Sequence, residues 1–156
     1  RGTMVYEGPI IKNESENEEG GSEIEKIRLV ARSKANRPPR LFISIVDFYD
    51  GDWRGFDQAY DKDGNKFHAL SVRHAVECTL LCGYEEILEV EINKNYLDLY
   101  SPHGITMKLY GPGTVASVPF TIPAQYIQGF MKGMYLESEE TSGLTLHIDP
   151  APHAAP

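Results

Sequence analysis

The sequence predicts an α+β fold made of two β-β-β-β-α repeats, in which antiparallel sheets pack against two helices. Several short segments between residues 24 and 120 alternate apolar and polar side chains, as half-buried strands do. Two other segments, 71–82 and 121–134, have apolar residues at helical spacing directly after a strand. Their starting positions, Ser71 and Thr121, are fifty residues apart, which favours a repeated unit.

The first unit is predicted to contain four strands and a helix. Pro38 and Pro39 separate the first two strands, and the segment DKDG forms a hairpin turn before the fourth. Ser71 is predicted to cap a helix that Gly83 ends. The predicted strands are 25–33, 40–50, the end of 50–60, and 65–70.

The second unit is predicted to repeat this order. Thr121 takes the capping position of the second helix, and Pro123 lies in the first turn, where its missing N–H is harmless. The helix continues through AQYIQGFMKGM, which presents Ile127 and Phe130 on one face. The predicted strands are 86–92, 96–101, 105–111 and 115–120.

The charge distribution separates a central domain from two acidic ends. Residues 24–136 are predicted to form one domain of two units, about 24–83 and 84–136. Residues 1–23 carry six acidic and two basic side chains and are predicted to be a disordered tail that opens with a cloning remnant, RGTM. Residues 137–156 are predicted to be an acidic, partly disordered extension. These two ends account for the whole net charge of -8.

The composition disfavours several classes of protein. No segment is long and apolar enough for a membrane helix, so a soluble chain is expected. Cys78 and Cys82 fall four residues apart on a predicted helix, where they cannot readily form a disulfide, and this favours a reducing, intracellular environment. His74 joins them on that face, but no second ligand pair completes a zinc site. We expect no metal, no cofactor and no enzymatic activity, because catalytic motifs are absent from the sequence.

Two segments, KFHALSVRHAVECTLLCG and VPFTIPAQYIQGFMKGM, resemble strand-to-helix segments of the Whirly family of single-stranded-DNA-binding proteins. A third, IRLVARSKANRPPRLFISIVDFY, resembles the opening strand pair of the transcriptional coactivator positive cofactor four, which has a related fold. The resemblance covers roughly residues 24–136 and rests on the order of elements. It implies binding of single-stranded nucleic acid, a role in transcription regulation, and a homo-oligomer with helices near its axis.

A basic segment independently favours a nucleic-acid ligand. Between Lys26 and Val46 there are six basic residues and no acidic one, which would form a track for phosphates along a strand pair. Aromatic side chains nearby could stack on bases. The alternative is a solvated basic face balanced by aspartates between 47 and 57, with the aromatics in the core.

We therefore predict a non-enzymatic protein that binds single-stranded DNA or RNA with weak sequence preference. Self-association is expected, whereas a membrane or a small-molecule substrate is not. A protein-interaction or clamp-like module without direct nucleic-acid binding is the alternative function. The predicted contact residues are Lys26, Arg28, Arg32, Lys34, Arg37, Arg40, Phe42, Phe48, Trp53, Arg54, Lys66, Tyr96 and Lys108.

Overall fold

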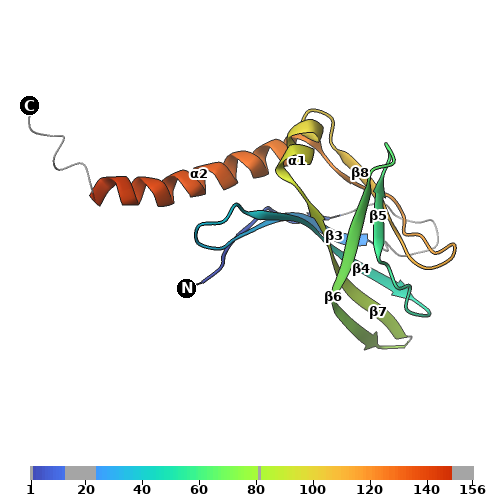
Figure 1. Cartoon of the computed structure of the whole chain (residues 1–156). Coiled ribbons are helices and arrows are strands. Elements are labelled where there is room, and N and C mark those ends of the chain that lie inside the picture. The colour runs from blue at the N-terminus through green and yellow to red at the C-terminus, as the bar shows by residue number, and fades with distance from the viewer. Residues whose placement is uncertain (1, 13–23, 81, 149–156) are drawn as a thin grey trace, which may run out of the picture.

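A computed structural model describes residues 2–12, 24–80 and 82–148, with only the backbone for 137–148. Within these ranges, nine strands form one curled antiparallel sheet, accompanied by two helices (Figure 1). The strand order is β1-β3-β4-β7-β6-β5-β8-β9, and β2 also pairs with β3. The strands are β1 (Met4–Glu7), β2 (Ile11–Lys12), β3 (Ile24–Ser33), β4 (Arg40–Asp50), β5 (Gln58–Asp61), β6 (Lys66–Cys78), β7 (Cys82–Ile92), β8 (Ile105–Tyr110) and β9 (Phe120–Ile122).

The centre of the sheet is the antiparallel set β3, β4 and β7. Leu29 lies opposite Ile43, which in turn lies opposite Val90, and all three side chains are buried. Alternate residues of each strand face the interior because successive side chains point to opposite faces. The predicted strands 25–33, 40–50 and 86–92 are therefore confirmed.

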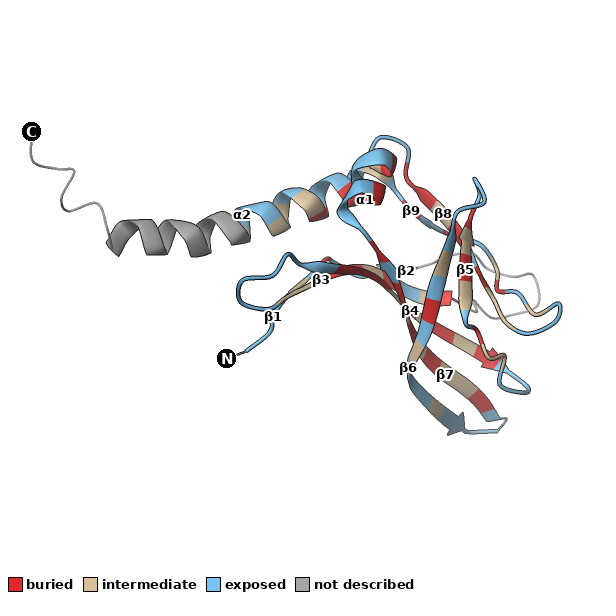
Figure 2. Ribbon diagram, in the orientation of Figure 1, coloured by how far each residue is buried: buried red, intermediate tan, exposed pale blue. Residues whose placement is uncertain are grey.

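Strand β6 connects two parts of the sheet that face each other across the core. Residues 66–68 pair with β5, whereas residues 69–78 pair with β7. The β5-β8-β9 part consequently folds back toward the inner face of β3, β4 and β7. Buried residues of both parts form one cluster, and Figure 2 shows the exposed surface at the C-terminal end of β6.

The two helices close the core near one end of the sheet. Helix α1 (Lys94–Tyr100) begins after Asn93, whose side chain accepts a hydrogen bond from the N–H of Tyr96. Helix α2 (Ala124–Ile148) buries Ile127 and Phe130, and its C-terminal part extends beyond the sheet (Figure 1). The hydroxyl of Tyr126 accepts from the N–H of Leu29 and donates to the carbonyl of Pro9, linking α2 to β3 and the N-terminal segment.

The predicted α+β fold of two β-β-β-β-α repeats is wrong, because the chain is mostly antiparallel strand in a half-barrel. The expected helix at 71–82 is the second half of β6 and the start of β7, and the expected strand at 96–101 belongs largely to α1. Ser71 and Thr121 lie within strands rather than at helix caps. Only the second predicted helix is found, and it continues to residue 148.

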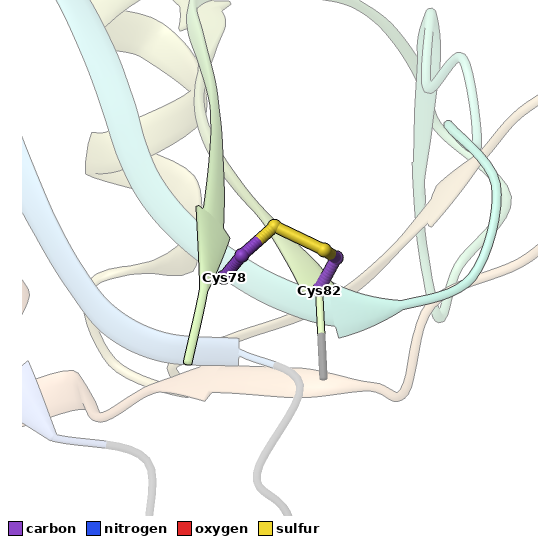
Figure 3. Close-up of a disulfide and its surroundings, with 2 residues drawn as sticks. All are labelled: Cys78 and Cys82. Atoms are coloured by element: carbon purple, nitrogen blue, oxygen red, sulfur yellow. A yellow bond between two sulfur atoms is a disulfide. The ribbon is translucent and has the colours of Figure 1, made fainter. Parts of the chain in front are cut away.

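The cysteine prediction is also wrong. Cys78 and Cys82 lie directly opposite each other on β6 and β7 and form a disulfide across the end of the hairpin (Figure 3). Opposed strand residues hold their Cβ atoms close together, whereas the two positions on a helix would not. The disulfide removes the ground for expecting a reducing compartment.

The N-terminal segment is more ordered than we expected. Residues 4–7 and 11–12 were predicted to belong to a disordered tail but form β1 and β2 against β3. The remainder of that tail, 13–23, and the end of the C-terminal extension, 149–156, lie outside the described residues.

Candidate nucleic-acid interface

The β3–β4 hairpin positions most of the predicted basic residues at one end of the sheet. Arg32 ends β3 and lies opposite Arg40, the first residue of β4. Between them, the N–H of Arg37 donates to the carbonyl of Lys34 at 3.1 Å, and Asn36 adopts a φ of 65°. Asparagine tolerates this left-handed conformation better than most residues, so the sequence favours a tight connection here.

A cleft of about 450 Å³ lies at this end of the hairpin. The guanidinium carbons of Arg32 and Arg40 lie 4.8 Å and 5.3 Å from the ring centroid of Phe42, at cation–π distance. Phe42 itself is 8% exposed, so the two arginines cover most of its ring. We call this the hairpin cleft, and its lining residues are Thr3, Arg32, Lys34, Arg37, Pro38, Arg40 and Phe42.

Acidic residues of β7 neutralise part of the basic surface. Arg32 makes a two-point ion pair with Glu89, including an Nη1–Oε2 distance of 2.8 Å. Arg40 makes a similar pair with Glu91, at 2.8 Å and 2.7 Å. Hydrogen bonding to these carboxylates raises the pKa of both arginines, and the hydrogen bond from Arg40 lowers the pKa of Glu91. Sequence inspection missed this pairing because β7 lies more than forty residues from the hairpin.

Two cations of the cleft remain available. Lys34 and Arg37 are exposed and form no ion pair with the side chains that the structure describes. Arg28, by contrast, pairs with Glu7 at 2.8 Å. Lys26 is exposed farther along β3, opposite Lys12 of β2 and Val46 of β4. The predicted six-residue stripe is therefore divided, and its net positive charge concentrates around Lys34 and Arg37.

Three predicted contact residues lie at the other end of β4 rather than at the cleft. Phe48 is half-buried opposite Glu85 of β7. The ring of Trp53, 56% exposed, lies 5.4 Å from that of His74. The guanidinium of Arg54 lies 4.6 Å from the centre of the Tyr49 ring.

A second, smaller basic surface lies on the outer side of the β5-β8 part of the sheet. Lys66 and Lys108 lie opposite Tyr60 from its two neighbouring strands. The rings of Tyr60 and Tyr110 are 5.5 Å apart in an edge-to-face arrangement. We call these four residues the lysine–tyrosine row. Tyr60 was missed in the sequence, since its place between the lysines depends on strand register.

Tyr96 is not available to a ligand. Its side chain is buried, and its hydroxyl donates to Asp61 at 2.8 Å. Burial and this hydrogen bond raise the pKa of Tyr96. Burial also disfavours ionised Asp61, but hydrogen bonds from Asn65, Tyr96 and two backbone N–H groups outweigh it and lower the pKa of Asp61. This network organises the β5–β6 turn, so Tyr96 is a structural residue.

Two acidic residues of the central strands are buried, which the sequence analysis did not predict. Asp47 and Glu86 lie opposite each other on β4 and β7, and both have 0% exposure. The hydroxyl of Tyr49 donates to Glu86 Oε1, whereas Glu86 Oε2 has no hydrogen-bond partner among the described atoms. Opposed residues of neighbouring strands hold their Cβ atoms close together, so two acidic side chains are buried side by side here. The described residues contain no cluster suited to a metal ion.

Comparison with known proteins assigns no family to the chain. No helix within the described ranges is long and apolar enough to span a membrane. No family model, no curated protein and no solved structure matches this chain.

Proposed function

We propose that the chain binds single-stranded nucleic acid through the hairpin cleft. The observation that carries this proposal is the convergence of four cations on one cleft, two of which, Lys34 and Arg37, lack an acidic partner among the described side chains. Like charges repel one another, so their grouping is explained most simply by an anionic ligand.

Phosphate groups would contact Lys34 and Arg37 first. Arg40 would follow, because its side chain is 67% exposed and an exposed ion pair such as Arg40–Glu91 contributes little stability. Its guanidinium could exchange the carboxylate of Glu91 for a phosphate, which arginine also binds at two points. Arg32 is less available, since its partner Glu89 is only 10% exposed.

A single strand suits this cleft better than a duplex. The guanidinium planes above Phe42 offer a stacking surface for an unpaired base, and stacking is independent of base identity. Bases of a duplex are stacked on one another and cannot use such a surface. The overall charge of -8 opposes any polyanion, so we expect weak binding that decreases as salt rises.

The experiment is a fluorescence-anisotropy titration of the full chain with labelled single-stranded DNA, single-stranded RNA and duplex DNA at about 20 mM salt. We expect preference for single strands. The variant Lys34→Gln/Arg37→Gln should bind at least about tenfold more weakly, since it removes both available cations. Lys66→Gln/Lys108→Gln is the matched control, because it removes the same charge from the lysine–tyrosine row.

The outcomes separate the alternatives. Equal weakening by both double variants would mean that binding depends on overall charge and not on the hairpin cleft. If only the Lys66→Gln/Lys108→Gln variant loses binding, the interface lies at the lysine–tyrosine row and not at the hairpin cleft. If the wild type binds no oligonucleotide at low salt, the protein-interaction module takes the place of the proposed function.

A further inference from the structure

The second half of β6 has a free edge. Residues 66–68 pair with β5, and the N–H of Ala69 donates to the carbonyl of Asp57 at 3.0 Å. From Leu70 to Cys78 the strand pairs with β7 alone among the described elements. Its opposite edge therefore presents unpaired backbone N–H and C=O groups, which readily accept another strand. Most proteins protect such an edge with lysine, proline or a covering segment.

Several apolar side chains are exposed along this edge. Leu70, Val72 and Val76 are 56%, 47% and 56% exposed, and Leu80 in the adjoining turn is 99% exposed. A bulge at Val72 is the only irregularity within the paired stretch. Exposed apolar side chains concentrated along one unpaired strand indicate an interaction surface.

The charges along β6 fit a second copy of the same strand. Arg73, Ala75 and Glu77 are alternate residues and share one face. In a symmetric antiparallel pair centred on Ala75, Arg73 of each copy lies opposite Glu77 of the other. Neither side chain forms an ion pair with the described part of its own chain. Registers centred on Arg73 or Glu77 would oppose like charges and are disfavoured.

We propose that two copies of this chain dimerise by antiparallel pairing of their β6 edges, with Ala75 at the two-fold axis. The small Ala75 side chains allow close approach at the centre. On the opposite face, Val76 of each copy meets His74 of the other. Leu70, which the bulge places on the same face as Ala75, and Val72 lie near the partner's hairpin end. The Cys78–Cys82 disulfide holds β6 against β7 at that end, so the edge is ordered before the partner binds (Figure 3).

The test is sedimentation of the full, oxidised chain over roughly a hundredfold range of concentration. Wild type should be in monomer–dimer equilibrium. Arg73→Glu and Glu77→Arg should each weaken dimerisation at least about tenfold, because each places two like-charge pairs at the interface. Lys62→Glu, an exposed residue of the β5–β6 turn, is the matched control for the charge change of Arg73→Glu and should leave the dimer intact.

Two combinations make the test specific to the register. The double variant Arg73→Glu/Glu77→Arg should dimerise again, since its charges are complementary in reverse. An equimolar mixture of the two single variants should form a heterodimer, although each alone stays monomeric. A monomeric wild type at every concentration would overturn the proposal, and so would dimers that neither single reversal affects. Failure of the mixture to associate would overturn the Ala75 register. None of these outcomes depends on oligonucleotide binding.

Discussion

Tyr49 compensates the burial of Glu86. Its hydroxyl donates to Glu86 Oε1 and accepts from the N–H of Arg54 at 3.1 Å. Burial, together with the carboxylate of Glu86, raises the pKa of Tyr49, which keeps the hydroxyl protonated and able to donate. Because Glu86 Oε2 has no described partner, the bond to Tyr49 is the main compensation for burying this carboxylate.

We predict that Tyr49→Phe lowers the free energy of unfolding by roughly 2–3 kcal/mol, because it leaves a buried carboxylate without its donor. Urea denaturation of wild type and variant measures this. Tyr84→Phe is the matched control, since its ring stacks on Tyr49 at 5.7 Å but the described hydrogen bonds do not include its hydroxyl. A loss no larger for Tyr49→Phe than for Tyr84→Phe would show that the hydroxyl does not compensate Glu86.

The lowered pKa of Asp61 should make the stability of the fold depend on pH. Its pKa is lowered from the ordinary value of 3.8, so the folded state favours the ionised form. The stabilisation is fully present above about 3.8 and is lost as pH falls through the lower, folded-state pKa. Asp61→Asn should therefore reduce stability at neutral pH and flatten the decline in acid, measured by thermal melts from about pH 7 to about pH 2. An unchanged acid decline would contradict the role given to Asp61.

At the residue scale, the sequence indicates proximity best for side chains that are close along the chain. Arg32, Lys34, Arg37 and Arg40 belong to a single hairpin, and the structure brings them to one cleft. Their neutralising partners could not be predicted, because the position of β7 next to β4 follows from the sheet order and not from local pattern.

At the scale of elements, β6 shows why a strand was mistaken for a helix. Val72, Ala75 and Val76 recur at helical spacing, but their spacing arises from a bulge at Val72 and from apolar residues on both faces of a free edge. For α1 the error was the opposite one, because a helix was predicted to be a strand. Tyr96, Leu97 and Tyr100 are buried at helical spacing, yet tyrosine and leucine in a short segment also suit a strand. By contrast, β3 and β4 alternate regularly and were predicted correctly.

The disulfide predicts a measurable stabilisation of the β6–β7 hairpin. Cys78 and Cys82 are four residues apart, so the loop that they close is short and the expected contribution is about 2 kcal/mol. Replacing both cysteines with serine should lower the free energy of unfolding by this amount, as measured by urea denaturation under oxidising conditions. Reducing the wild type should have a similar effect, and it should not change the double-serine variant. If reduction leaves wild-type stability unaltered, the disulfide does not constrain the unfolded chain.

At the scale of the whole molecule, the sheet separates regions of different charge. The outer face of β3, β4 and β7 carries alternating basic and acidic partners, exemplified by Arg32–Glu89 and Arg40–Glu91. Net positive charge remains at the end of the β3–β4 hairpin, around Lys34 and Arg37. An acidic chain can therefore present a local basic site, and this distribution of charge would make the proposed binding weak and sensitive to salt.

The central claim, that the hairpin cleft binds phosphates, is tested most directly by the salt dependence of affinity. The measurement is the association constant for a labelled single-stranded oligonucleotide at several salt concentrations, for wild type and Lys34→Gln/Arg37→Gln. Each lost phosphate contact reduces the slope of log K against log salt by roughly 0.7. We predict a slope smaller by about 1.4 in the variant, and no change of slope in Lys66→Gln/Lys108→Gln. If the Lys34→Gln/Arg37→Gln variant has the same slope of log K against log salt as wild type, the claim is contradicted.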